Sequence, residues 1–225
     1  MTDQSPRPVA GRTVLIAGAT SAAGLAVASG LTDAGARVIA VGSDAGRLDD
    51  LTQKVNGLAT HVCDLTSWAA VSDLAATVHA DTGPIDGLIH LVGGWRGGGG
   101  LAGQSDEDWD FLHSRIVTTL RHTTRAFNDD LLASPAGRLA IVSSVITANP
   151  TPGGANYAAA KAAAETWTHA VGNGFAKAGD TAATAIFVVR ALEGLENLLA
   201  EGVVGLWNAE QAAINNTRIP LHVVT

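Results

Sequence analysis

Three residues in this sequence have the types and spacing that a proton transfer requires. Tyr157, the only tyrosine of the chain, stands four residues before Lys161. On a helix this spacing places both side chains on one face, about 40° apart. A tyrosine hydroxyl of pKa about 10 is a poor acid or base at neutral pH, and a nearby ammonium favours its ionised form. The spacing predicts a reacting pair; the alternative is a tyrosine at a helix start and a solvated lysine.

Ser144 precedes the tyrosine by 13 residues and ends an apolar run. The loop between them, "VITANPTPGGAN", is rich in proline and glycine and can turn the chain back. The hydroxyls of Ser144 and Tyr157 can then meet at one oxygen. A carbonyl that receives hydride from a dihydronicotinamide needs this arrangement, because one donor stabilises the developing charge and the other delivers a proton. The distance in sequence to Tyr157 favours Ser144 as the catalytic serine, and we expect Ser143 to have a structural role.

A glycine turn follows the first apolar run. Gly18 ends the run, and Gly24 stands six residues later at the start of a helical stretch. Such a turn directs backbone N–H groups, backed by the helix dipole, at a pyrophosphate. The alternative is that the glycines serve only the turn from strand to helix. The cofactor-binding residues expected here are Gly18, Thr20, Ser21, Ala22, Ala23 and Gly24.

The ends of the second and third apolar runs should contact the adenosine part of a dinucleotide. An acid suits a free 2′-hydroxyl and a basic residue suits a 2′-phosphate. If the second strand ends at Val41, Ser43 with Arg47 can accept a phosphate, whereas a longer strand lets Asp44 repel it. We expect NADP(H), with NAD(H) as the alternative. Asp64 is expected either to accept from the adenine amino group or to cap the next helix.

Parallel strands must position these residues. Continuous apolar runs separated by helical stretches are typical of strands covered on both faces, and they predict a doubly wound α/β fold. Ligands bind such sheets outside the carboxyl ends of the strands. The expected strands lie in residues 13–19, 36–42, 60–65, 85–94, 138–145, 182–189 and 217–225. The expected crossover helices begin at Leu25, Ala45, Trp68, Asp106 and Tyr157.

Composition narrows the class of protein. With 225 residues, 47% of them hydrophobic and 16% charged, we expect one globular domain. Within residues 1–225 it comprises a polar tail (1–11), a glycine-rich loop (93–103) and a C-terminal region (190–225). The net charge of −7 argues against nucleic acid and anionic membranes as partners. A single cysteine excludes an internal disulfide, and the scattered histidines do not favour a metal site. The sequence shows neither a signal peptide nor an apolar run long enough to span a membrane, so we expect a cytoplasmic protein.

Five stretches in order, "AGATSAAG", "CDLT", "LIHLVGG", "IVSSV" and "YAAAK", resemble the short-chain dehydrogenase/reductase family over residues 12–189. The resemblance implies a seven-stranded doubly wound sheet and NAD(H) or NADP(H) as cofactor. It implies that Tyr157 is the general acid/base, that Lys161 lowers its pKa and holds the nicotinamide ribose, and that Ser144 orients the substrate carbonyl. It also implies a homodimer or homotetramer formed through the fourth and fifth helices. Further cofactor contacts are expected at Leu65, Val92 and Gly93.

The chain departs from this family's pattern at several positions. Ala22 replaces the middle glycine of the turn, and Ile116 replaces an asparagine of the proton relay. Arg190 and Ala191 stand near the usual Pro-Gly, and little chain follows for a substrate lid, so a divergent, C-terminally shortened member is expected. An alternative is a dinucleotide-binding sensor or scaffold with little catalysis. The candidates for the substrate cleft are Trp95, Arg96, Val145 and Ile146; Trp95 and Arg96 are equally consistent with a surface loop.

Overall fold

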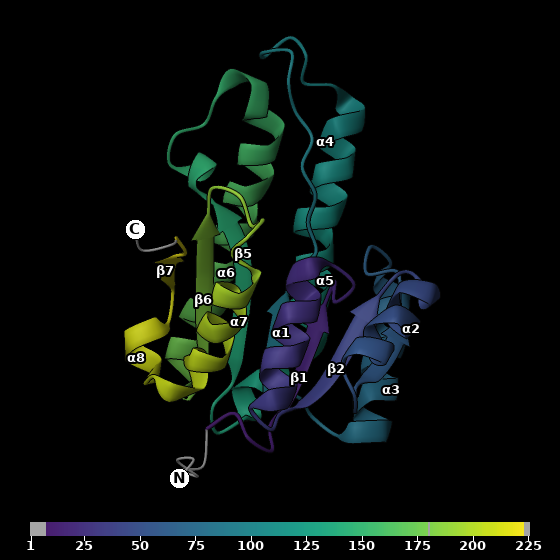
Figure 1. Cartoon of the computed structure of the whole chain (residues 1–225). Coiled ribbons are helices and arrows are strands. Elements are labelled where there is room, and N and C mark those ends of the chain that lie inside the picture. Colours follow the sequence, from purple (N-terminus) through teal and green to yellow (C-terminus); the bar gives the residue numbers. More distant parts are fainter. Residues whose placement is uncertain (1–7, 180, 223–225) are drawn as a thin grey trace.

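The computed structural model describes residues 8–179 and 181–222, and its centre is a seven-stranded sheet (Figure 1). The order is β3-β2-β1-β4-β5-β6-β7, and every adjacent pair is parallel. All seven predicted strands are confirmed, and most are shorter than the apolar runs that predicted them. Residues 1–7 of the expected tail and 223–225 of the expected last strand lie outside the described residues. The strands are β1 (Thr13–Ala17), β2 (Arg37–Gly42), β3 (Ala59–Val62), β4 (Gly87–His90), β5 (Arg138–Ser144), β6 (Ala183–Val189) and β7 (Thr217–Pro220).

The five predicted crossover helices form, together with further helices that the sequence reading did not anticipate. The helix expected from Leu25 begins earlier, at Ala22, because Ser21 caps it and accepts from the Gly24 amide. Within the described chain, no helix is both long and apolar enough to span a membrane. The α-helices are α1 (Ala22–Asp33), α2 (Ala45–Lys54), α3 (Trp68–Thr82), α4 (Asp106–Leu112), α5 (Thr119–Ala133), α6 (Ala155–Ala178), α7 (Glu196–Gly205) and α8 (Gln211–Ile214).

Short helical turns complete the connections. The π-helix η1 (His113–Thr118) joins α4 to α5, and the three form a single rod in Figure 1. A π-helical turn inserts residues into the regular i to i−4 pattern and frequently occurs at functional sites. The 3₁₀ turns are η2 (Val145–Thr147), η3 (Pro152–Gly154) and η4 (Leu206–Asn208).

Both faces of the sheet are covered by helices, as a doubly wound fold requires. Along β1, Val14 and Ile16 pack on one face with α1, α2 and α7, whereas Leu15 and Ala17 pack on the other with α3, α5 and α6. All four side chains are fully buried. This double burial explains why the inner strands have continuous apolar sequences, whereas the edge strands β3 and β7 alternate half-buried and exposed residues.

Helix α7 lies against α1, and the two run side by side across one face of the sheet (Figure 1). Val27 and Leu31 of α1 share a core with Leu199 and Val203 of α7, and all four are fully buried. The C-terminal region therefore completes the core.

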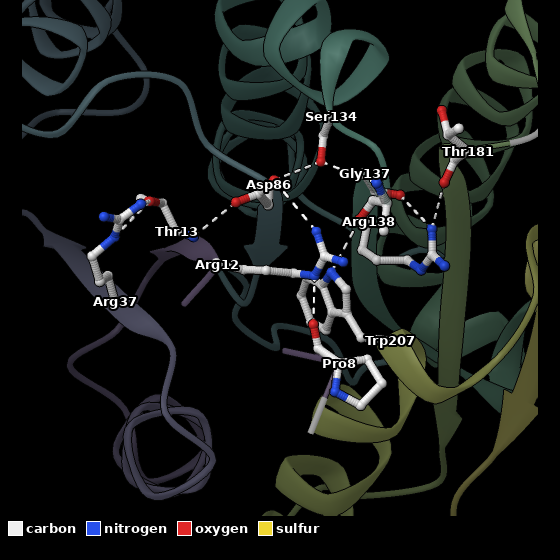
Figure 2. A network of polar contacts seen from close by, with 11 residues as sticks. Pro8, Arg12, Thr13, Arg37, Asp86, Ser134, Gly137, Arg138, Thr181 and Trp207 are labelled. Atoms are coloured by element: carbon white, nitrogen blue, oxygen red, sulfur yellow. Dashed lines mark hydrogen bonds and ion pairs between the residues drawn. The ribbon is translucent and has the colours of Figure 1, made fainter. Parts of the chain in front are cut away.

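A polar network stabilises the edge of the sheet at the amino ends of the strands (Figure 2). Arg138, at the start of β5, is buried with 4% of its surface exposed. Its guanidinium donates to four backbone carbonyls at 2.7–3.1 Å. Nearby, the Asp86 carboxylate accepts from the Thr13 amide and the Ser134 hydroxyl. The carbonyls that Arg138 contacts belong to Gly137, Thr181, Leu206 and Ala209.

Candidate active site

The predicted serine, tyrosine and lysine meet at the carboxyl edge of the sheet. Ser144 is the last residue of β5, and Tyr157 and Lys161 lie in the first two turns of α6. The Lys161 ammonium is 5.8 Å from the centre of the Tyr157 ring, so the helix places both on one face as the spacing predicts. The proline- and glycine-rich loop returns the chain so that Ser144 and Tyr157 line the same cavity, where Ser144 acts on the pKa of the phenol.

Lys161 is buried and held in place by the sheet. Its Nζ donates to the carbonyl oxygen of Val142 in β5 at 2.8 Å, and 7% of the residue surface is exposed. Burial lowers the pKa of Lys161 to about 8, while the negative charge of Glu165 opposes that shift. A lysine of this pKa still carries its proton at neutral pH.

The pKa of Tyr157 is shifted opposite to the direction that the sequence suggests. Burial raises the pKa of Tyr157 above its ordinary 10.0, and the hydrogen bond with Ser144 only partly opposes this. Lys161 was expected to lower the pKa of Tyr157, but burial is the dominant cause of its shift and the opposing contribution comes from Ser144. In this structure the phenol is therefore protonated at neutral pH.

The glycine turn has the backbone geometry of an anion-binding turn. Gly18 adopts a φ of 82°, and a Cβ added there would lie 2.8 Å from the backbone nitrogen of Val92. Ala22 and Ala23 occupy the first turn of α1, where helix amides lack intrahelical acceptors. Gly24 packs against the backbone of Ala19, so that position serves the turn itself.

Two adjoining cavities lie along this edge of the sheet. The larger, of about 870 Å³, contains the serine, tyrosine and lysine together with Ser21, Ala22 and Ala23. The smaller, of about 270 Å³, is lined by Gly18, Thr20, Ser43, Asp64 and Leu65. Ser21, Val92 and Gly93 line both cavities. Every predicted catalytic or cofactor-binding residue except Gly24 therefore lines one of two adjoining cavities.

The second strand ends close to the position at which Ser43 and Arg47 were predicted to accept a phosphate. The strand ends at Gly42, and Ser43 with Arg47 lines the smaller cavity. Asp44 instead caps α2, with its Oδ1 accepting from the Arg47 amide at 2.9 Å. Asp44 is not among the residues that line this cavity.

Of the two readings of Asp64, helix capping is wrong. Ser67 is the N-cap of α3, and its hydroxyl accepts from the Ala70 amide. The Asp64 carboxylate accepts from the Thr66 amide and hydroxyl, and these hydrogen bonds lower the pKa of Asp64. A carboxylate that stays ionised in the smaller cavity is a hydrogen-bond acceptor there.

The far end of the larger cavity differs from the family pattern, as the sequence indicates. Arg190 and Ala191 line it directly after β6. Ile116 is buried in the apolar core between α5, α6 and the sheet, so its side chain contributes no hydrogen bond. His90 is buried between Thr119 and Thr123, where burial and the charge of Lys161 lower its pKa to about 3. The imidazole is therefore neutral.

The glycine-rich loop supplies one wall of the cleft. Trp95 lines the larger cavity with Val145 and Ile146, and 66% of its surface is exposed. Arg96 lies outside this lining and contacts Asp108 at 3.3 Å and the Phe111 ring at 4.2 Å. The lining interpretation therefore holds for Trp95 and is wrong for Arg96.

Sequence reasoning missed two polar side chains near the site. Gln104 donates from Nε2 to carbonyls of Gly98, Gly100 and Gly153, and its Oε1 accepts from the Asn156 amide directly before the tyrosine. Glu165 lies one turn beyond Lys161 in α6 and is buried. The four-residue spacing of Tyr157, Lys161 and Glu165 indicates that the three share one helix face, and it could have identified Glu165. No pattern in the sequence indicates the role of Gln104.

Comparisons with known proteins agree with this geometry. A family model described as short chain dehydrogenase matches residues 12–188. Gluconate 5-dehydrogenase of Gluconobacter oxydans is 32% identical over 76% of this chain and 68% of its own length. A 2,3-dihydro-2,3-dihydroxybenzoate dehydrogenase of Bacillus subtilis is 28% identical over 73% of this chain and 64% of its own. The chain thus matches about two thirds of the length of these relatives.

A solved structure of a metagenomic short-chain oxidoreductase in complex with NADP has the same fold. It superposes with a TM-score of 0.82 at 21% identity, covering 96% of this chain and all of that one. The family model spans most of the chain and includes strands β1 to β5, nearly all of β6 and the serine, tyrosine and lysine, whereas β7 and the cleft residues Arg190 and Ala191 lie beyond it. The chain belongs to the short-chain dehydrogenase family.

Proposed function

We propose that this protein is an NAD(P)(H)-dependent oxidoreductase that reduces a ketone or aldehyde, or oxidises the corresponding alcohol. The observation that carries the proposal is the convergence of Ser144, Tyr157 and Lys161 in one cavity with the amino-terminal turn of α1. The relatives are named as dehydrogenases, and the similar solved structure holds NADP.

The cleft suits a dinucleotide on three grounds. The Gly18 turn lets the backbone approach closely, and the first amides of α1 suit a pyrophosphate. The smaller cavity offers the ionised Asp64 for an adenine amino group. Lys161 borders the larger cavity beside Gly93, where an ammonium suits ribose hydroxyls. When bound, the dihydronicotinamide supplies the hydride.

The residues of the chain then serve the carbonyl oxygen. Tyr157 holds its proton at neutral pH because burial raises its pKa, which suits a general acid in the direction of reduction. Ser144 donates a hydrogen bond to the same oxygen and stabilises the developing charge. The Lys161 ammonium, held by Val142, lies beside the tyrosine and favours the phenolate that the proton transfer leaves.

A substitution of the tyrosine tests this assignment. Oxidation of NADPH and NADH is followed at 340 nm with a panel of ketones and aldehydes. Tyr157→Phe removes only the hydroxyl, and we expect turnover to fall about 10²- to 10⁴-fold while dinucleotide binding persists. A carbonyl compound that both proteins reduce equally fast would contradict the role of Tyr157.

We further propose a preference for NADP(H). Ser43 and Arg47 line the smaller cavity, whereas Asp44 is engaged at the start of α2. Calorimetry should show that Arg47→Ala weakens binding of NADPH and leaves NADH unchanged. Equal loss for both dinucleotides would refute a contact with the 2′-phosphate.

A dinucleotide-binding protein with little catalysis is the second candidate. It is favoured by the buried Ile116 in place of a relay asparagine and by Arg190 in place of a proline. Binding of either dinucleotide by the purified protein, without turnover of any carbonyl in the panel, would support this candidate. Robust turnover would exclude it.

Assembly into a homodimer or homotetramer is also proposed, through the faces of the α4–α5 rod and α6. Trp167 of α6 lies at the α5 boundary, where it donates to the Thr124 hydroxyl and Arg121 lies over its ring. Light scattering after size-exclusion chromatography should give a mass of two or four chains. A monomer at micromolar concentration would exclude this proposal.

A further inference from the structure

A buried carboxylate lies beneath the tyrosine and lysine. Glu165 follows Lys161 by one helical turn in α6, as Lys161 follows Tyr157, so the three side chains share one face. Only 10% of the Glu165 side chain is exposed. A buried carboxylate requires hydrogen-bonding or charged partners, because removing the charge from water is costly.

The first oxygen of Glu165 contacts the segment that carries the proposed catalytic serine. Its Oε1 accepts from the Ser143 hydroxyl at 2.5 Å and from the Thr147 hydroxyl at 3.1 Å. Ser143 directly precedes Ser144 in β5, and the single proton of the Thr147 hydroxyl is shared between Glu165 and the Ser144 carbonyl, which is 2.9 Å away. Glu165 therefore fixes the chain on both sides of Ser144.

The second oxygen of Glu165 faces a cation from another strand. The Nε of Arg218 in β7 lies 3.4 Å from Oε2 of Glu165, and the Nη2 of Arg218 donates to the Thr147 hydroxyl at 2.9 Å. Carboxylate, arginine and threonine thus form a closed set of contacts. This set links β5, η2, α6 and β7.

The charges around Lys161 give the carboxylate a second role. The titratable groups that interact with the ammonium are Tyr157 and Glu165 on its own helix and His90 at the end of β4. Arg190, Glu193 and Glu196, which follow β6, line the same cavity as Lys161. Tyrosine and histidine are both neutral at pH 7 here, because burial shifts the pKa of each in the direction that disfavours its charged form. Of the three groups that interact with the ammonium, Glu165 is the one whose negative charge raises the pKa of Lys161.

We propose that Glu165 is a positioning residue of the active site, which joins the Ser144 end of β5 to α6 and supplies the negative charge that keeps Lys161 an ammonium. Its meaning for catalysis rests on the proposed oxidoreductase function. Its effect on the charge of Lys161 is independent of any turnover.

Lysine NMR tests the charge effect directly. The chain has three lysines, so protein labelled with ¹³C at lysine Cε gives three signals, which Lys54→Arg and Lys177→Arg assign. We expect Glu165→Gln to lower the apparent pKa of Lys161 by about one unit, because an attractive anion is lost. Arg218→Gln should raise it, because the carboxylate then loses its other counter-ion.

Opposite shifts in the two variants distinguish a charge effect from a loosened helix, which would move the pKa in one direction for both. Glu201→Gln, an exposed substitution on α7, is the matched control and should leave Lys161 unchanged. A Lys161 pKa within about 0.2 units of wild type in Glu165→Gln would overturn the proposal. If Glu165→Gln fails to fold, Arg218→Gln decides, since a fall or no change in its Lys161 pKa overturns the proposal.

The pH profile of carbonyl reduction supplies the catalytic readout. In Glu165→Gln the alkaline limb of kcat should move to lower pH, because Lys161 loses its proton earlier. A uniform loss of kcat with an unmoved limb would refute the role in setting the charge. A wild-type protein that reduces no carbonyl would refute the proposed function, and the lysine titration would still decide the role of Glu165.

Discussion

Replacing Arg138 by methionine should destabilise the protein strongly, although the residue lies at the opposite edge of the sheet from the cleft. The buried guanidinium donates to carbonyls from four positions, two of them in the segment after α7. Figure 2 shows the contacts with Gly137 and Thr181. Burial lowers the pKa of Arg138, yet an ordinary value of 12.5 leaves it charged at neutral pH. Methionine has a similar length, so the substitution removes hydrogen bonds with little loss of volume.

The magnitude follows from the number of carbonyls left without a donor. Each orphaned buried carbonyl costs about 1 kcal/mol or more. Removing a buried cation recovers part of that cost. We therefore expect Arg138→Met to lower the free energy of unfolding by about 3 kcal/mol, which lowers Tm by about 6–12 °C for a chain of this size. Arg138→Lys keeps the charge but satisfies fewer carbonyls, so about 2 kcal/mol is expected.

Urea unfolding monitored by tryptophan fluorescence measures this loss. Trp207 lies beside the network and donates to the Ala136 carbonyl, so it reports on the same region. Arg37→Met is the matched control, because within the described residues the side chain of that exposed arginine donates only to the Thr13 hydroxyl, and the substitution should cost less than about 1 kcal/mol. An Arg138→Met protein within about 0.5 kcal/mol of wild type would refute the reasoning.

Three further substitutions, one of them with a matched control, test other parts of the structure. Gly18→Ala should lower the free energy of unfolding by about 1–3 kcal/mol and weaken dinucleotide binding in calorimetry, because Gly18 has a φ of 82° and Val92 leaves no room for a Cβ. Gly174→Ala is the control: a Cβ there would have nothing within 4 Å, so the protein should be equally or more stable. Gln104→Ala should lower kcat about tenfold by loosening the chain before Tyr157, and unchanged kcat would contradict this. The pKa of His90 is about 3 in the folded protein and about 6.5 in the unfolded chain, so below pH 6.5 the unfolded state binds a proton that the folded state does not. The free energy of unfolding of the wild type should therefore fall by up to about 1.4 kcal/mol per pH unit as the pH drops below 6.5. His90→Asn should flatten this slope in urea titrations at pH 7, 6 and 5, and an equally steep slope would show that His90 is not its source.

The strands and the cleft could be predicted because they depend on local patterns. Every apolar run became a strand; burial on both faces removes polar alternation from the inner strands, whereas the edge strands β3 and β7 alternate half-buried and exposed residues. The glycine turn and the four-residue spacing of Tyr157 and Lys161 likewise depend on backbone geometry that neighbouring residues fix. Helix α7 was not anticipated, because its packing partner is α1, near the other end of the chain.

Side-chain environments could not be predicted in the same way. The pKa of Tyr157 depends on how deeply the fold buries the phenol, and its direction reversed the expectation drawn from Lys161 alone. Asp64 and Ser67 are both suitable capping residues, and only the start of α3 distinguishes them. The contacts of Gln104 and Glu165 join segments distant in sequence, and a single sequence does not reveal such pairs.

The packing of α7 on α1 affects how this protein can be made in a cell. Helix α1 leaves the ribosome early, but the apolar surface that covers it comes from Leu199 and Val203, near the end of synthesis. Contacts between residues this distant in sequence slow folding, and apolar surface that stays exposed until they form is prone to aggregation. The nascent chain therefore has a long interval in which chaperones can bind α1, and a ribosome that stops before α7 releases a product without a closed core.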